Sequence, residues 1–144
     1  MVYGSLREKI AAESAERRQR YADYATWIDE AHRAGLAAGK TAGCTPMIVS
    51  QHDNMADDNS AVVKEWLVMD GPCGFAWVTV TPGTCSFARW AVKEQGWRKD
   101  YYGGVSLYVH EFGQSMQRKI EYAHAYAKVL HSHGVGVRCN SRMD

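Results

Sequence analysis

A long helical stretch near the N-terminus constrains the fold of this chain more than any other feature. Ser5 and Glu8 form a capping-box pattern, in which each side chain accepts a hydrogen bond from the backbone amide of the other residue. We expect a helix to begin there and to run to about Ala38. Gly39 and Gly43 follow and are predicted to stop it, because glycine is the usual residue just after a helix.

The apolar residues of this helix are concentrated in its second half. They form a seam with helical spacing at Tyr21, Tyr24, Ile28 and Ala31, with Trp27 beside it. Upstream, only Leu6 and Ile10 continue the seam. The pattern predicts that the second half packs on a domain, while the first half projects or contacts a second chain. A docked amphipathic helix and a short coiled coil both fit so brief a seam.

The rest of the chain alternates between strand-like and helix-like segments. We expect strands at Thr45–Gln51, Val62–Met69, Phe75–Val80, Val105–His110 and Val135–Cys139. Helices are expected from about Ser86 to Gly96 and from about Ser115 to Gly134. The order predicts an α+β domain over 43–144, with residues 1–42 as an appendage or cap. Its sheet should be mixed, with four or five strands, parallel crossovers and two helices packed on it.

Two local interpretations concern the edges of this sheet. The turn residues of Asp70-Gly-Pro predict a hairpin between 62–69 and 75–80. Alternatively, 62–69 begins as a helical turn capped by Asn59 or Ser60. The last residues, 140–144, are expected to form a tail.

Large aromatic and charged side chains crowd into one predicted loop. They are Trp97, Arg98, Lys99, Tyr101 and Tyr102, and Gly103-Gly104 leads from them into a strand. Aromatic rings stack on bases and cations contact phosphates in proteins that bind single-stranded nucleic acid. The same residue types are favoured at protein interfaces. A third interpretation is a loop whose aromatic rings enter the core and whose cations face water.

Two other stretches of the sequence are weaker candidates for a functional site. His110, Glu111 and Ser115 follow a strand and could form the rim of a ligand or hydrolytic site. The acidic loop around Asp53, Asp57 and Asp58 lacks the pattern of a calcium-binding loop. We therefore expect no metal, no cofactor and no catalytic residue that the sequence alone can name.

Composition and charge set wider limits. No apolar run approaches the roughly 18 residues of a membrane-spanning helix, and the polar N-terminus is not that of a secretory signal. The 4 cysteines form no Cys-x-x-Cys, which favours reduced thiols in a cytoplasmic protein. Residues 1–85 hold 8 Lys and Arg against 11 Asp and Glu, whereas residues 86–144 hold 9 against 5. This asymmetry can favour head-to-tail contacts between copies.

Four short stretches of the C-terminal half stand out. They are Gly71-Pro-Cys-Gly-Phe-Ala-Trp77, Tyr102-Gly-Gly-Val105, Gly113-Gln-Ser115 and Ser141-Arg-Met-Asp144. In these stretches the chain resembles small proteins encoded in bacteriophage and prophage genomes. The resemblance implies an origin in the cytoplasm of an infected or lysogenic bacterium, and it transfers no activity, cofactor or site residue to this chain.

These observations lead to a ranked set of functional hypotheses. The first is an accessory protein that binds a host or phage protein and forms a homo-oligomer through residues 5–38. The second is a nucleic-acid-binding protein that uses residues 97–102, against which the near-neutral net charge of +1 argues. The third is a small-ligand-binding or hydrolytic site at residues 110–115.

Overall fold

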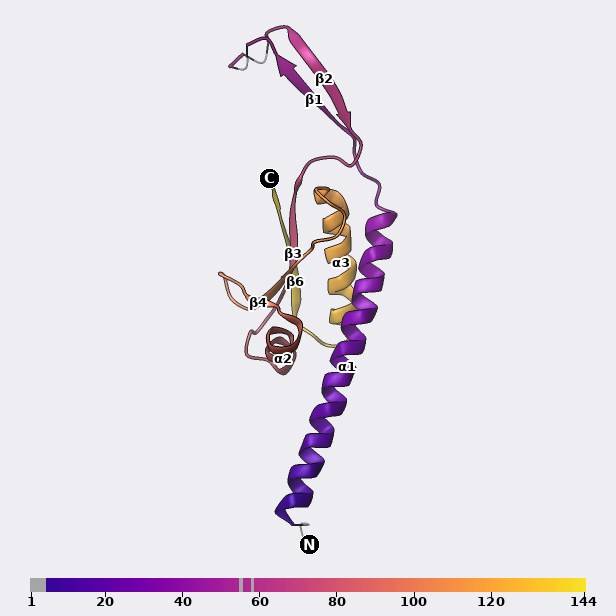
Figure 1. The fold of residues 1–144 in the computed structure, drawn as a ribbon, viewed down its shortest axis with the longest axis vertical. Helices are drawn as coiled ribbons and strands as arrows, with labels where there is room; N and C mark the ends of the chain where they lie inside the picture. Colours follow the sequence, from indigo (N-terminus) through magenta and orange to yellow (C-terminus); the bar gives the residue numbers. More distant parts are fainter. Residues whose placement is uncertain (1–4, 55, 58) are drawn as a thin grey trace.

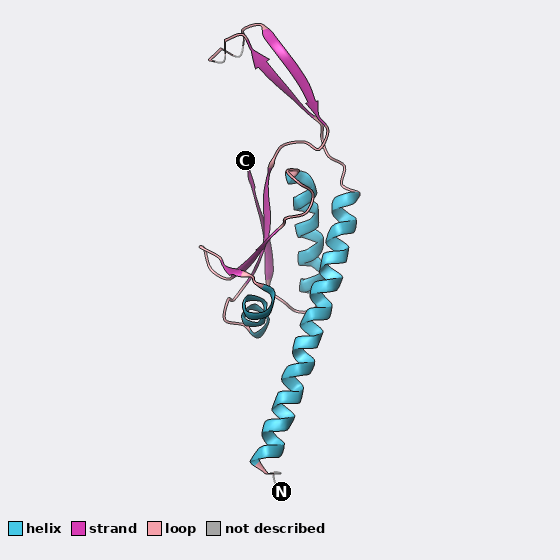
Figure 2. Ribbon diagram, viewed as in Figure 1, coloured by secondary structure: helices cyan, strands magenta, loops and turns pink. Residues whose placement is uncertain are grey.

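A four-stranded antiparallel sheet lies at the centre of the structure, and the helices lie on one side of it (Figures 1 and 2). The computed structural model describes residues 5–54, 56, 57 and 59–144. The helices are α1 (Leu6–Lys40), α2 (Ser86–Gln95) and α3 (Met116–Ser132). The strands are β1 (Met47–His52), β2 (Val62–Val68), β3 (Gly74–Val80), β4 (Arg98–Lys99), β5 (Val105–Tyr108) and β6 (Val137–Met143).

The chain from β3 onward follows the order β-α-β-β-α-β, and the strands lie in the order β4-β5-β3-β6. This is the connectivity of the split β-α-β, or ferredoxin-like, arrangement. The predicted α+β class is confirmed, but the prediction of a mixed sheet is wrong, because every neighbouring pair is antiparallel. α2 connects β3 to β4, and α3 connects β5 to β6. The two strands of each pair run parallel to each other, but a third strand lies between them in the sheet.

The hairpin of this protein is built from β1 and β2, not from β2 and β3 as the turn residues predicted. β5 and β6 occupy the two edges of β3, so that β2 has no free edge there to pair with. β2 pairs with β1 instead, and the resulting two-stranded arm projects beyond the domain (Figure 1). The alternative of a helical turn over 62–69 is also wrong.

The C-terminal residues belong to the sheet. β6 extends to Met143 and pairs with the whole length of β3, from Gly74 to Val80. The amide of Asp144 then donates to the Cys73 carbonyl at 3.0 Å. The predicted tail is therefore an error, since the unpaired edge of β3 supplies hydrogen-bond partners to residues whose polar sequence suggested none.

The core forms where one face of the sheet meets the helices. Ala76, Val78 and Val80 alternate along β3 and are buried on this face. Aromatic rings fill the space between the helices, and they are Tyr24, Phe87, Trp90, Trp97, Tyr122 and Tyr126. Ring centroids in this cluster lie 5.3 Å apart for Tyr24 and Phe87 and 5.8 Å apart for Phe87 and Trp97. The cluster ties all three helices together.

The close contact of α1 with α3 depends on small residues of α1. Ala31, Gly35 and Gly39 follow one another at intervals of one helical turn and are all buried. A Cβ atom on Gly35 would lie 2.7 Å from the Tyr122 ring, and one on Gly39 would overlap the Phe112 ring. Gly39 thus lies within the helix as a contact residue, and the prediction that it ends the helix is wrong.

Only the second half of α1 packs on the domain, as the apolar seam predicted. The capping box is present, because Glu8 N–H donates to Ser5 Oγ at 3.3 Å and Ser5 N–H donates to the Glu8 carboxylate at 3.1 Å. The first buried side chain of the helix is Tyr24, and residues 6–20 extend past the domain as a free helical arm (Figure 1).

Substitution of Gly35 by alanine tests the close contact between the helices. In an exposed helix this change stabilises by up to about 1 kcal/mol. Here we expect a net loss of about 1–2 kcal/mol in the free energy of unfolding, because the methyl group meets the Tyr122 ring. The Tyr122 hydroxyl lies 2.6 Å from His32 Nδ1, which holds the ring in place.

Urea denaturation of the variant against the native chain measures this effect. Gly43→Ala is the matched control, because nothing lies within 4 Å of a Cβ atom at that position. A Gly35→Ala protein as stable as the control would show that α1 and α3 are not in close contact.

Candidate functional site

The helices leave the second face of the sheet uncovered. Along β3, Phe75, Trp77 and Thr79 point to this side, because they alternate with the buried residues of the core face. Ser106 and Tyr108 of β5 lie directly opposite Thr79 and Trp77 in the antiparallel register. We call this surface the open sheet face.

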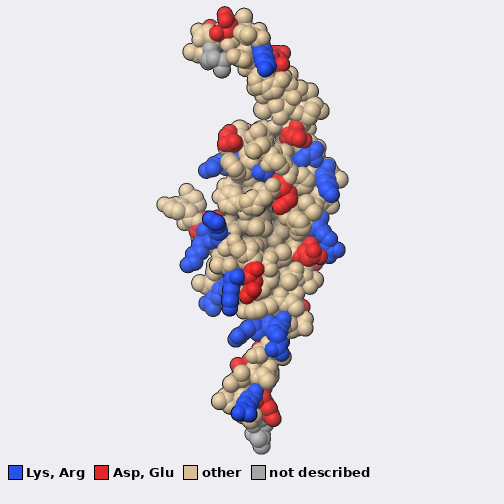
Figure 3. All heavy atoms as spheres, viewed as in Figure 1, with Lys and Arg blue, Asp and Glu red and all other residues tan. Residues whose placement is uncertain are grey.

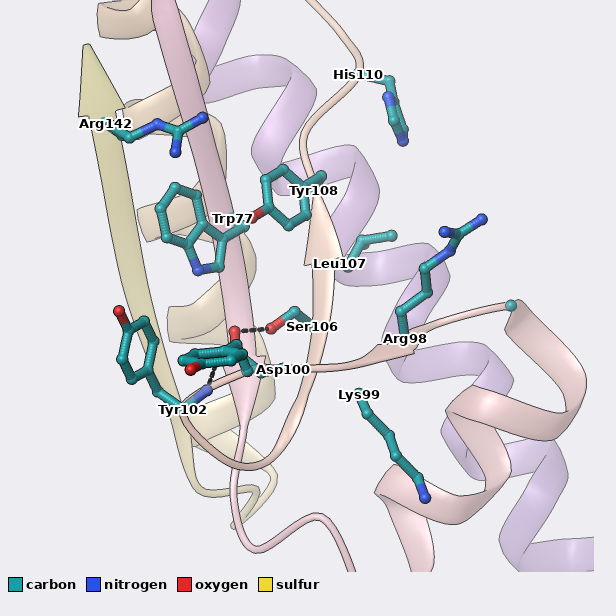
Figure 4. Close-up of a pocket in the computed structure, with 12 residues that line it drawn as sticks. Trp77, Arg98, Lys99, Asp100, Tyr102, Ser106, Leu107, Tyr108, His110 and Arg142 are labelled. Carbon is teal, nitrogen blue, oxygen red and sulfur yellow. Dashed lines mark hydrogen bonds between the residues drawn. The ribbon is translucent and has the colours of Figure 1, made fainter. Parts of the chain in front are cut away.

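Two aromatic rings form the middle of the open sheet face. Trp77 and Tyr108 are cross-strand partners, and their rings stack with centroids 5.0 Å apart and planes inclined by 14° (Figure 4). Tyr108 is 47% exposed. Because these two rings cover each other's inner faces, any flat molecule would have to stack on an outer face of the pair.

The turn between β4 and β5 is held by one carboxylate. Asp100 Oδ2 accepts a hydrogen bond from the Ser106 hydroxyl and lies 3.3 Å from Thr79 Oγ1, and Asp100 Oδ1 accepts from Tyr102 N–H at 2.8 Å (Figure 4). The Ser106 hydroxyl, followed by the Tyr102 amide, lowers the pKa of Asp100. Gly103, with φ of 103°, and Gly104, with φ of 81°, then return the chain to β5.

This turn displays two tyrosines to solvent. Tyr101 is 93% exposed and Tyr102 is 85% exposed. Their rings are arranged edge to face, with centroids 4.9 Å apart. Neither ring contributes to the core, so their exposure has no explanation in the packing of the domain.

Cations surround the same aromatic residues. Arg98, Lys99 and Arg142, together with His110, line a hollow of about 660 Å³ that also contains the aromatic pair (Figure 4). Among the described residues, no ion pair engages any of these four side chains. The Arg142 guanidinium instead lies 5.4 Å from the centroid of the Phe75 ring. Lys and Arg atoms are visible over this side of the molecule in Figure 3.

The loop predicted to bind a partner is divided by the structure. Arg98, Lys99, Tyr101 and Tyr102 line the hollow. Trp97 does not, because it is 4% exposed and packs against Phe87 in the core. The third interpretation of this loop therefore holds for Trp97 alone, since α2 ends just before it and turns its ring inward.

The predicted ligand rim is also divided. His110 lines the hollow, so it shares a surface with residues 98–102. Ser115 is 4% exposed and serves as the N-cap of α3. Glu111 has one buried carboxylate oxygen with no hydrogen-bond partner among the described residues. Burial, and after it the charge of Glu111, raises the pKa of Tyr122.

Sequence reasoning missed Trp77, Tyr108 and Arg142 as site residues. The alternation of side chains along β3 does not by itself show which of its two faces the helices leave uncovered. Arg142 was assigned to a tail. The sequence did contain an indication of this surface. Trp77 and Tyr108 alternate with the apolar residues that face the core in two predicted strands.

Comparisons with known proteins identify no relative. No protein-family model, curated protein or solved structure matches this chain. Among the described residues, no group of three or more His, Cys, Asp and Glu side chains is arranged to hold a metal ion, and Asp58 lies outside those residues. None of the described helices has the length and apolarity to cross a membrane.

The role of Asp100 in fixing the turn predicts a pH-dependent stability. Because the pKa of Asp100 is lowered from its ordinary value of 3.8 in the folded protein, its stabilising contribution is complete above that pH and is lost as the pH falls through the folded pKa. We expect Asp100→Asn to cost about 1 kcal/mol at pH 7, since hydrogen bonds to a charged acceptor are weakened. The difference from the native chain should then shrink below pH 4.

Chemical denaturation at a series of pH values measures this difference. Asp53→Asn, on the exposed hairpin, is the control for removal of one carboxylate. A stability difference for Asp100→Asn that is unchanged from pH 7 to pH 3 would contradict the assigned role.

Proposed function

We propose that this protein binds single-stranded nucleic acid on the open sheet face. The observation that carries the proposal is the combination, on one uncovered surface, of exposed aromatic rings with cations that form no ion pair within the part of the chain that the structure describes. Stacking platforms and a basic surface that follows the backbone are the two components of single-strand recognition.

The placement of the aromatic residues supports the proposal. Trp77 and Tyr108 lie on β3 and β5, the two central strands of the sheet. In RNA-binding domains with a four-stranded sheet and helices on one face, bases stack on aromatic residues of the uncovered face. The outer faces of the Trp77–Tyr108 pair and the two exposed tyrosines of the turn offer several surfaces for successive bases.

The charges support it as well. Arg98, Lys99 and Arg142 surround the rings, and the one carboxylate in the hollow, Asp100, is occupied by hydrogen bonds within the turn. The net charge of the whole chain is only +1, but binding depends on the local field at the surface and not on the total. The acids of the chain lie largely on other elements.

A protein partner, which was the first sequence-based hypothesis, remains a prediction for this surface. Tyrosine and arginine are favoured at protein interfaces too. What favours nucleic acid here is the group of cations without acidic partners. Each such contact with a phosphate makes the affinity fall steeply with salt, whereas a mainly apolar protein interface lacks this steep dependence.

Removal of the two exposed tyrosines tests the stacking part of the proposal. Because neither ring contacts the core, Tyr101→Ala/Tyr102→Ala should fold normally and should bind a fluorescent single-stranded oligonucleotide roughly 10-fold more weakly or worse. Fluorescence anisotropy measures the affinity. Trp66→Ala is the control, because Trp66 is an exposed aromatic residue of the hairpin, away from the open sheet face. Equal loss in both variants would contradict the assignment of the surface.

Removal of two cations tests the electrostatic part. For Arg98→Ala/Lys99→Ala we expect a weaker salt dependence. The slope of log affinity against log salt should become less negative by about 1.4, since each phosphate contact to a single strand contributes about −0.7. The control Lys40→Ala/Lys128→Ala removes the same charge from α1 and α3, and it should leave the slope unchanged. If the native chain binds neither DNA nor RNA single strands at low salt, the proposed function is wrong.

A further inference from the structure

Two parts of the described chain project from the domain. The hairpin of β1 and β2 projects at one end of the molecule, and residues 6–20 of α1, the free helical arm, project at the other (Figure 1). A two-stranded hairpin is marginally stable at best in water, and it needs a further surface to pack against.

One side of the hairpin carries three apolar side chains around a polar pair, in which the Ser50 hydroxyl donates to the Glu65 carboxylate at 3.4 Å. Ile48 and Leu67 are directly opposite each other, and Val63 lies on the same side of β2 by alternation. These three side chains, which we call the hairpin face, are 66%, 57% and 64% exposed in the order Ile48, Leu67, Val63. On the other side, the Lys64 ammonium lies 5.3 Å from the centroid of the Trp66 ring, and Trp66 is 45% exposed.

The free helical arm carries the matching features. Leu6 and Ile10 lie one turn apart on the helix and are 72% and 53% exposed. The arm of 15 residues is about 22 Å long at 1.5 Å per residue. Strands of 6 and 7 residues extend about 20–24 Å, so that the two projections are equal in length.

The charges of the two projections are complementary. The basic residues of the free helical arm are Arg7, Lys9, Arg17, Arg18 and Arg20, against the acids Glu8, Glu13 and Glu16. The hairpin carries Asp53, Asp57 and Glu65 against Lys64. No ion pair occupies the basic residues of the arm within the described chain. Figure 3 shows acidic atoms at the outer end of the hairpin and basic atoms along the arm.

We propose that two copies of this chain associate by a two-fold axis, with the hairpin face of each copy lying along the free helical arm of the other. A two-fold axis makes both contacts at once and leaves no projection unpaired. Contact between two hairpins would instead bring acidic residues together, and contact between two arms would bring basic residues together.

The two-fold arrangement fixes which ends meet. The two domains lie side by side, and the hairpin of one copy runs in the same direction as the free helical arm of the other. The outer end of the hairpin therefore lies beside the outer end of the arm. The first turns of α1, with Arg7 and Ile10, therefore lie beside the outer part of the hairpin, with Asp53 and Val63. This register assigns Ile10 and Val63 to the same region of the contact.

A charge-reversal experiment on the full chain tests the proposal. Light scattering after size exclusion should give a dimer for the native protein. Val63→Lys adds a cation opposite the basic arm, and Ile10→Glu adds an acid opposite the acidic hairpin, so each single variant should weaken the dimer at least 10-fold. Both sites are more than half exposed in the single copy, so neither change disturbs the core.

The double variant, Val63→Lys/Ile10→Glu, should restore the dimer, because each new lysine meets the partner's new glutamate. Several outcomes would overturn the proposal: a native monomer, a mass that grows with concentration as in an open chain of copies, or a double variant that stays monomeric. If the dimer is lost in Val63→Lys but kept in Ile10→Glu, the contact is between two hairpins, and if it is lost in Ile10→Glu but kept in Val63→Lys, the contact is between two arms. Either result also overturns it.

Discussion

The close contact of α1 with α3 determines the arrangement of everything else in this protein. Ala31, Gly35 and Gly39 allow the two helix backbones to approach, and Tyr122 fills the space that glycine leaves. Since α3 in turn covers β3 and β6, this contact closes one face of the sheet completely. A bulkier residue at any of these three positions would lift α1 from the domain and would expose the aromatic cluster beneath it.

The open sheet face is the consequence of closing only one side. A sheet of four antiparallel strands with helices on one face must present its second set of alternating side chains to solvent or to a ligand. In this chain that set contains the aromatic residues Trp77 and Tyr108 beside the small polar residues Thr79 and Ser106. Asp100 adds a second element of order, because its hydrogen bonds fix the turn that displays Tyr101 and Tyr102. A fixed turn presents aromatic rings with little loss of conformational entropy on binding.

The two proposals concern separate parts of the molecule and reinforce each other physically. The hairpin and the free helical arm project beyond the domain that carries the open sheet face (Figure 1). The proposed two-fold pair, joined through hairpin and free helical arm, would carry two open sheet faces on one particle. Two weak binding surfaces on one particle act on the same strand at a high effective concentration, which raises the total affinity without any new contact.

The sequence by itself determined the local elements of this protein. The capping box of Ser5 and Glu8, the apolar seam from Tyr21 and the cap at Ser115 are short-range patterns, and they placed α1 and α3 within a few residues. Only the tertiary structure decided which strands pair, because the free edges of β3 are taken by β5 and β6 across long sequence separations. That pairing sent β2 to β1, brought the supposed tail into the sheet, and joined Trp77, Tyr108 and Arg142 into one surface. Trp97 and Tyr101 are alike as residues in a sequence, and their burial differs only because one follows the end of α2 into the core while the other stands on a turn.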